Sequence, residues 1–93
     1  MAPTLQWTGK ALADLTQLYA FLASVNQPAA ARIVQQLTAA PISLLAHPRL
    51  GEQLDEFLPR EVRRIFAGQY EIRYEVQGTT ITVLRLWHTR ESR

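Results

Sequence analysis

The chain has 93 residues, of which 47% are hydrophobic and none is cysteine. That length supports one small domain, residues 1–93, and the apolar fraction favours a packed core over wholesale disorder. Disulfides and thiolate metal sites are excluded. Because histidine and acidic residues show no ligand spacing, no metal or other cofactor is expected. No apolar run approaches the roughly 20 residues that span a bilayer. The N-terminus lacks a signal-peptide pattern, so a cytoplasmic location is expected.

The basic residues are concentrated in the last third of the chain. Residues 1–59 carry three basic and four acidic side chains, whereas residues 60–93 carry seven basic and four acidic ones. The formal net charge of +2 therefore comes from the C-terminal part alone. Such a patch suits nucleic acid, the ribosome or an acidic protein segment, without choosing among them.

The first half of the chain predicts a short strand and a helical hairpin. Residues 4–7 alternate briefly and favour a strand, and Thr8 is a suitable N-cap for the next helix. Asn26 is the expected cap of a second helix, which should kink at Pro41 and end at His47-Pro48. One apolar stripe on the first helix comprises Ala11, Leu12, Leu15, Leu18, Tyr19, Leu22 and Val25. The residues expected to be buried are Leu15, Leu18, Leu22, Ile33 and Leu37.

The second half predicts an acidic connecting loop and three strands. Residues 49–60 form the loop, and strands are predicted at 61–67, 69–77 and 79–87, the last two joined by a tight turn around Gly78. In the middle strand, alternate residues from Tyr70 to Val76 should face the helices, and the open face should carry Glu71, Arg73 and Glu75. The fold class is therefore α+β: an N-terminal helical hairpin packed on a small antiparallel β-sheet.

Arginines are threaded through these strands. An arginine in an apolar strand must reach a carboxylate, a phosphate or water, because burying it unpaired is prohibitive. The open sheet face is therefore expected to bind something acidic. The candidate binding residues are Arg63, Arg64, Arg73, Arg85, His88 and Arg90.

A structural interpretation stands beside the functional one for several of these residues. Arg63 and Arg64 are adjacent and face opposite ways, so at most one of them belongs to a shared surface. For Arg85, a structural carboxylate such as Asp14 or Glu75 is as good a partner as a ligand. His88 at a strand end is either a local hydrogen-bonding residue or a catalyst.

The order strand, helical hairpin, loop and three-stranded meander resembles the RelE/ParE toxin superfamily of bacterial toxin–antitoxin modules. Five motifs in the same order carry the resemblance: Ala13-Asp14-Leu15, the turn at residues 26–31, His47-Pro48-Arg49-Leu50-Gly51, the Gly68-x-Tyr70-x-x-x-Tyr74 strand, and the ending from Leu84 to Arg90. The resemblance implies the RelE/ParE-like fold and a growth-inhibiting toxin neutralised by a cognate antitoxin protein, with which it is expected to form a hetero-oligomer. The antitoxin should add a strand or lay a helix beside the hairpin.

Within the superfamily two mechanisms compete. ParE-like members bind DNA gyrase, whereas RelE-like members are metal-independent endoribonucleases that cut mRNA on the ribosome. The resemblance favours ParE-like action because Glu71 stands where RelE-like proteins commonly carry arginine. The loop before the sheet is acidic rather than lysine-rich, and the chain ends without a catalytic tyrosine. A carboxylate facing a scissile phosphate costs electrostatic stabilisation.

The nuclease alternative keeps a specific set of residues. Arg73 lies on the same face as Glu71 and could replace the missing arginine. His88 would then act as general acid or base, and Arg85 and Arg90 would hold the anion. Under this alternative the catalytic residues are Arg73, His88 and Arg90, and the partners are the ribosome and mRNA.

Overall fold

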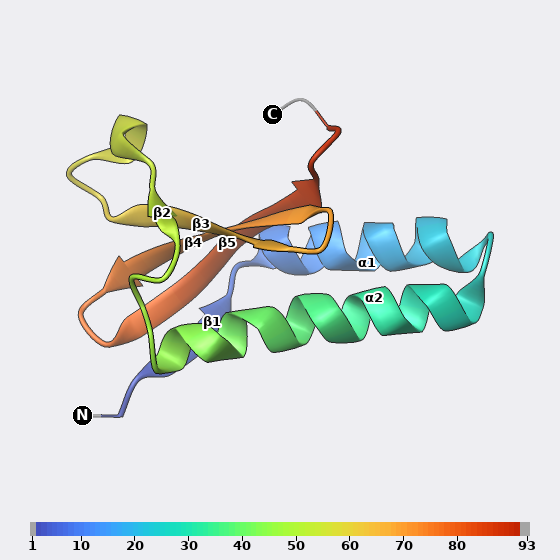
Figure 1. Cartoon of the computed structure of the whole chain (residues 1–93), viewed down its shortest axis with the longest axis horizontal. Helices are drawn as coiled ribbons and strands as arrows, with labels where there is room; N and C mark the ends of the chain where they lie inside the picture. Colours follow the sequence, from blue (N-terminus) through green and yellow to red (C-terminus); the bar gives the residue numbers. More distant parts are fainter. Residues whose placement is uncertain (1, 92–93) are drawn as a thin grey trace.

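The computed structural model describes residues 2–91 and places two α-helices on one face of a five-stranded sheet (Figure 1). The elements in chain order are β1 (Thr4–Trp7), α1 (Gly9–Ala23), α2 (Gln27–Ala39), the 3-10 helix η1 (Ala40–Leu45), β2 (Glu52–Gln53), the 3-10 helix η2 (Asp55–Phe57), β3 (Val62–Ala67), β4 (Tyr70–Gln77) and β5 (Thr80–His88). The predicted α+β fold class is confirmed.

The sheet is mixed rather than purely antiparallel. Its strand order is β1-β5-β4-β3-β2. The predicted meander of β3, β4 and β5 is antiparallel throughout, but β1 pairs with β5 in parallel. Parallel neighbours need a long crossover connection, and here the helical hairpin begins that connection. The acidic segment expected to be a loop also contributes to the sheet, because β2 pairs with Arg63 and Arg64 of β3.

Both predicted helix caps are confirmed. The Thr8 hydroxyl accepts the Ala11 N–H at 3.0 Å, and the Asn26 side-chain oxygen accepts the Ala29 N–H at 3.0 Å. The prediction of a kinked second helix needs correction, because α2 ends at Ala39 and the chain continues as η1 around Pro41. Proline has no N–H for the α-helical ladder, so the backbone tightens there instead of bending. No helix within residues 2–91 is long and apolar enough to cross a membrane.

The core lies between the sheet and the near half of the hairpin. Leu37 is fully buried as predicted, beside Ile72 and Val83 of the sheet. The other four predicted core residues are only partly buried. The apolar stripe predicted for the first helix is covered only in part. Leu12 and Tyr19 of α1 expose 51% and 36% of their surface, and Val25, which exposes 83%, lies beyond the end of α1 at Ala23. The tip of the hairpin, where Val25 lies between α1 and α2, extends beyond the sheet (Figure 1).

A buried tyrosine fixes the segment between η1 and β2. The Tyr74 hydroxyl donates to the Pro48 carbonyl at 2.8 Å and accepts the Gly51 N–H at 2.9 Å. Burial raises the pKa of Tyr74, so the phenol stays protonated and able to donate. The His47-to-Gly51 motif is therefore anchored to the middle strand, which positions β2 against β3.

Candidate functional site

Three arginines form a row across the sheet face that the helices leave open. The strand register pairs Arg64 of β3 with Arg73 of β4, and Arg73 with Arg85 of β5. Residues paired across neighbouring strands point to the same face of a sheet. Three of the candidate binding residues are thus brought together in one line.

A β-bulge in β5 directs Arg85 to this face. Val83 and Arg85 pair with the consecutive residues Tyr74 and Arg73, so Leu84 is an extra residue on β5. Strict alternation would put Arg85 on the same side as the buried Val83. The bulge separates them: Val83 packs in the core and Arg85 reaches the open side.

Arg85 is bound by the helical hairpin rather than left for a ligand. Its guanidinium donates two hydrogen bonds to Asp14 of α1, at 2.7 and 3.0 Å. The Leu86 N–H also donates to Asp14 at 3.1 Å. The hydrogen bond to Asp14 raises the pKa of Arg85. Of the two structural carboxylates that the sequence leaves open for Arg85, the structure selects Asp14, which joins α1 to β5.

Arg64 and Arg73 are also neutralised within the chain. Arg64 contacts Glu52 at 2.8 Å and Glu71 at 3.7 Å. Arg73 contacts Glu71 at 3.3 Å, and its guanidinium carbon lies 4.7 Å from the centre of the Trp87 ring and 5.6 Å from that of Phe57. No local sequence pattern indicates these ring contacts, because Phe57 comes from η2, in the segment that the sequence predicts as a loop.

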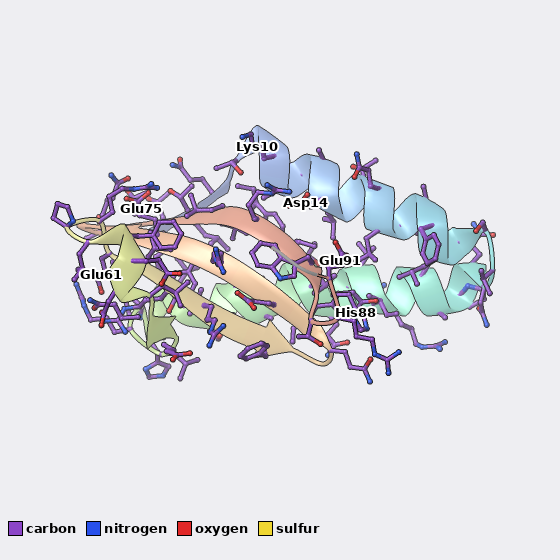
Figure 2. All side chains as sticks on the ribbon, turned by 90° about the horizontal axis from the view of Figure 1, so that it is seen from above. Lys10, Asp14, Glu61, Glu75, His88 and Glu91 are labelled. Carbon is purple, nitrogen blue, oxygen red and sulfur yellow. The ribbon has the colours of Figure 1, made fainter. Side chains whose placement is uncertain are left out.

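The carboxylates on this face are buried. Glu71 and Glu75 expose only 7% and 8% of their surface. The alternation in β4 correctly predicts their side of the sheet, but not that the β2–η2 segment and neighbouring arginines cover them. Figure 2 views this side of the sheet, with Glu61 and Glu75 at one end and His88 and Glu91 at the other.

Arg63 lies apart from the row, as its adjacency to Arg64 requires. It pairs with Tyr74, whose side chain is in the core. Its guanidinium donates to Glu61 at 2.8 Å, to the Gly51 carbonyl at 2.8 Å and to Gln53 at 3.2 Å. Arg63 therefore ties the edge of the sheet to the segment around β2.

His88 points to the opposite face from the arginine row. It pairs with Tyr70, and their ring centres lie 5.2 Å apart in an edge-on arrangement. Its Nδ1 accepts the Arg90 N–H at 3.0 Å, so the proton of the neutral ring is on Nε2, which lies 3.0 Å from the side-chain oxygen of Gln69. Both ring nitrogens are thus used within the chain. The Arg90 side chain is exposed.

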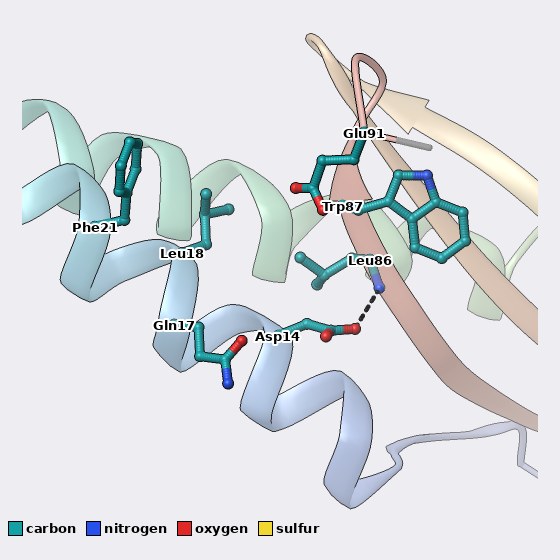
Figure 3. Close-up of a pocket in the computed structure, with 7 residues that line it drawn as sticks. All are labelled: Asp14, Gln17, Leu18, Phe21, Leu86, Trp87 and Glu91. Atoms are coloured by element: carbon teal, nitrogen blue, oxygen red, sulfur yellow. Dashed lines mark hydrogen bonds between the residues drawn. The ribbon is translucent and has the colours of Figure 1, made fainter. Parts of the chain in front are cut away.

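A pocket of about 280 Å³ lies between α1 and the end of β5 (Figure 3). Leu18, Phe21, Leu86 and Trp87 form its apolar wall, and Asp14 and Glu91 bring carboxylates to it. Within residues 2–91 there is no group of three or more acidic or histidine side chains arranged to hold a metal ion.

Acid should destabilise the fold through carboxylates paired with arginine. Hydrogen bonds from Arg60 hold the pKa of Glu75 below its usual 4.5, and a hydrogen bond from Arg63 does the same for the pKa of Glu61. A lowered carboxylate pKa contributes stability above the unfolded value that is lost as pH falls through the folded one. We expect the melting temperature to fall below about pH 4.5 and Glu75→Gln to flatten that dependence. Thermal melts from pH 3 to 7, with the exposed Glu56→Gln as control, test this; equal flattening by both variants would contradict it.

The comparisons with known proteins agree with this architecture. The chain matches the family model for the ParE toxin of type II toxin–antitoxin systems (parDE) over residues 5–93. It is 33% identical over 82 residues to Toxin RelE2 of Caulobacter vibrioides, covering 88% of this chain and 90% of that protein. It is 34% identical over 85 residues to Toxin RelE1 of the same organism, covering 90% of each chain.

Solved structures show the same fold. The chromosomal ParDE toxin–antitoxin system of P. aeruginosa contains a chain that aligns with a TM-score of 0.77 at 26% identity, covering 94% of this chain and 96% of that one. The archaeal RelE–RelB complex of Pyrococcus horikoshii aligns with a TM-score of 0.69 over 99% of this chain and all of its counterpart. Its 14% identity supports the fold alone.

These matches define the class of the protein as a toxin of a type II toxin–antitoxin system. Within that class, the chain belongs to the ParE toxin family of the RelE/ParE superfamily, whose family model spans nearly its whole length.

Proposed function

We propose that this toxin acts by binding DNA gyrase, without nuclease chemistry, and that a cognate antitoxin neutralises it in the cytoplasm. The state of His88 carries the proposal. A general acid or base needs a ring nitrogen that can reach the reacting oxygen. In His88 one nitrogen accepts the Arg90 N–H and the other lies against Gln69. The ring also lies across the sheet from Arg73 and Arg85.

The electrostatics of the open face support the same proposal. To hold a scissile phosphate, Arg64 and Arg85 would have to exchange Glu52 and Asp14 for the ligand. The buried carboxylate of Glu71 would still lie beside the phosphate and oppose its charge. Glu71 is no such obstacle to binding a protein partner. Binding gyrase requires a surface with complementary charges and ring contacts, and it does not require the stabilisation of a charged transition state.

A second candidate, ribosome-dependent cleavage of mRNA, is favoured by one observation. The row of Arg64, Arg73 and Arg85 across three strands places three guanidinium groups, which commonly contact phosphates, on one sheet face. Proteins named ParE and proteins named RelE are both similar to this chain. The choice between the two mechanisms therefore rests on the side chains of this protein.

Purified toxin assayed on both targets will separate the mechanisms. We expect inhibited supercoiling by gyrase and intact mRNA on programmed ribosomes. Arg73→Ala should then weaken gyrase inhibition by the loss of one interface contact, about 1–3 kcal/mol. The exposed Arg32→Ala on α2 is the matched arginine control. Cleavage in the ribosomal A site that falls by roughly 10²–10³-fold in His88→Ala would instead establish the nuclease.

A further inference from the structure

The carboxylates that neutralise the arginine row are not held equally firmly. Each arginine of the row has a carboxylate within 3.3 Å, and the three carboxylates are those of Asp14, Glu52 and Glu71. Three positive charges therefore face three negative ones. Two of the carboxylates are built into the fold, because Asp14 also accepts the Leu86 N–H and Glu71 exposes only 7% of its surface.

Glu52 differs from the other two because its charge can be removed without unpacking the core. Its side chain is 63% exposed, and it lies on the two-residue strand β2. The carboxylate bonds the guanidinium of Arg64, whereas β2 is held to β3 by main-chain pairing that does not involve this side chain. Neutralising Glu52 therefore leaves the strand in place and releases one guanidinium.

Arg64 would carry an uncompensated charge without Glu52. Its other carboxylate contact, Glu71, is 3.7 Å away and already contacts Arg73 at 3.3 Å. Two guanidinium groups would then share one carboxylate, and one positive charge would remain. The pKa of Arg64 reflects this dependence: the hydrogen bond to Glu52 is the main cause that raises it, and the charges of Glu71 and Glu56 add to the effect.

An exposed aromatic ring lies beside this guanidinium. Phe66 exposes 55% of its surface, and the guanidinium carbon of Arg64 is 5.5 Å from the centre of its ring. The two residues are two apart on β3 and so lie on the same face of the sheet. A cation beside an exposed ring suits single-stranded nucleic acid, whose phosphates meet the cation while its bases stack on the ring. An acidic peptide would use the cation but not the ring.

We propose that Glu52 is a specificity-determining residue, whose carboxylate holds Arg64 in place of a phosphate and so keeps single-stranded nucleic acid off the arginine row. This inference goes beyond the proposed function, since it concerns a ligand that the toxin excludes. A chain with an isoelectric point of about 9.5 is attracted to polyanions, and a toxin directed at a protein gains from excluding them. The competing carboxylate is part of the chain, so it acts at a high effective concentration.

Titration of the purified toxin into a fluorescent oligoadenylate of about 12 nucleotides, followed by anisotropy, tests the proposal. Glu52→Gln should bind about tenfold more tightly than the wild type at low salt. The slope of log affinity against log salt concentration should steepen by about 0.7, the value for one added phosphate contact on a single strand. Asp55→Asn is the matched control, because it removes one charge from the neighbouring η2, where Asp55 accepts a hydrogen bond from Gln53. Its slope should equal that of the wild type.

Two double variants locate the gain in affinity. Glu52→Gln combined with Arg64→Ala has the net charge of the wild type and should return both the affinity and the slope to wild-type values. Glu52→Gln combined with Phe66→Ala should bind about tenfold more weakly than Glu52→Gln alone but keep its steeper slope, because a stacked ring makes no phosphate contact. Melting temperatures check that each variant is folded.

Three results would overturn the proposal. The first is that Glu52→Gln binds no more tightly than Asp55→Asn, or that its gain survives Arg64→Ala. The second is a wild-type toxin that already binds the oligoadenylate as tightly as Glu52→Gln does. The third is an equal gain for an oligoglutamate peptide that Phe66→Ala does not reduce, which would assign Arg64 to an acidic protein segment. Gyrase is absent from this assay, so a failure here leaves the proposed function untouched.

Discussion

Leu37→Ala is expected to lower the free energy of unfolding by about 2–5 kcal/mol. Leu37 has no exposed surface and lies in the cluster formed with Ala11 of α1 and Tyr70, Ile72 and Leu86 of the sheet. Removing its branched end leaves a cavity where helix and sheet meet, and a small domain has only about 5–15 kcal/mol in total. Urea unfolding followed by circular dichroism measures the loss.

Leu12→Ala is the matched control for Leu37→Ala. Both are leucines within α-helices, but Leu12 exposes 51% of its surface. Its replacement should change stability by no more than about 0.5 kcal/mol, because little area is lost and alanine favours the helix. If the two variants lose equal stability, the apolar stripe of α1 is covered more fully than its exposed surface indicates.

The helical stripe illustrates what the sequence can predict. Helical spacing locates α1 and α2, and the predicted caps at Thr8 and Asn26 are correct because capping depends on residues three apart. Spacing does not say how far a neighbouring layer extends. The apolar period runs on to Val25, but α1 ends at Ala23 and Val25 lies at the tip of the hairpin with 83% of its surface exposed.

The candidate site, like the helices, has some features that the local sequence predicts and others that it does not. Alternation in β4 predicts the face that carries Glu71 and Arg73, because side-chain direction in a strand is local. The partners of the arginines are not local. Asp14 and Arg85 are 71 residues apart in the sequence. The bulge at Leu84 that lets them meet contains no glycine or proline by which the sequence could predict it. For His88 the sequence allows both a local hydrogen-bonding role and catalysis. The assays on gyrase and the ribosome distinguish these two roles.

Gly51→Ala is expected to cost about 3 kcal/mol, since it combines overpacking with loss of a buried hydrogen bond. A Cβ at position 51 would lie 2.5 Å from the Arg64 carbonyl oxygen and 2.7 Å from the Tyr74 hydroxyl. The carbonyl belongs to β3 and cannot move alone. The Tyr74 ring is fully buried, so the segment carrying Gly51 must be pushed outward and lose its bond to that hydroxyl.

The damage should spread along the edge of the sheet. The Gly51 carbonyl accepts a hydrogen bond from Arg63, and β2 begins at the next residue. We therefore expect Gly51→Ala to increase amide exchange in β2 along with the loss of stability. Gly9→Ala is the control, because apart from the adjacent residues and the backbone of its own helix no atom lies within 4 Å of the place its added methyl group would take, and alanine favours the helix that begins there. If Gly51→Ala unfolds at the same urea concentration as Gly9→Ala, the close packing of Tyr74 against this segment is wrong, and with it the anchoring of β2 against β3.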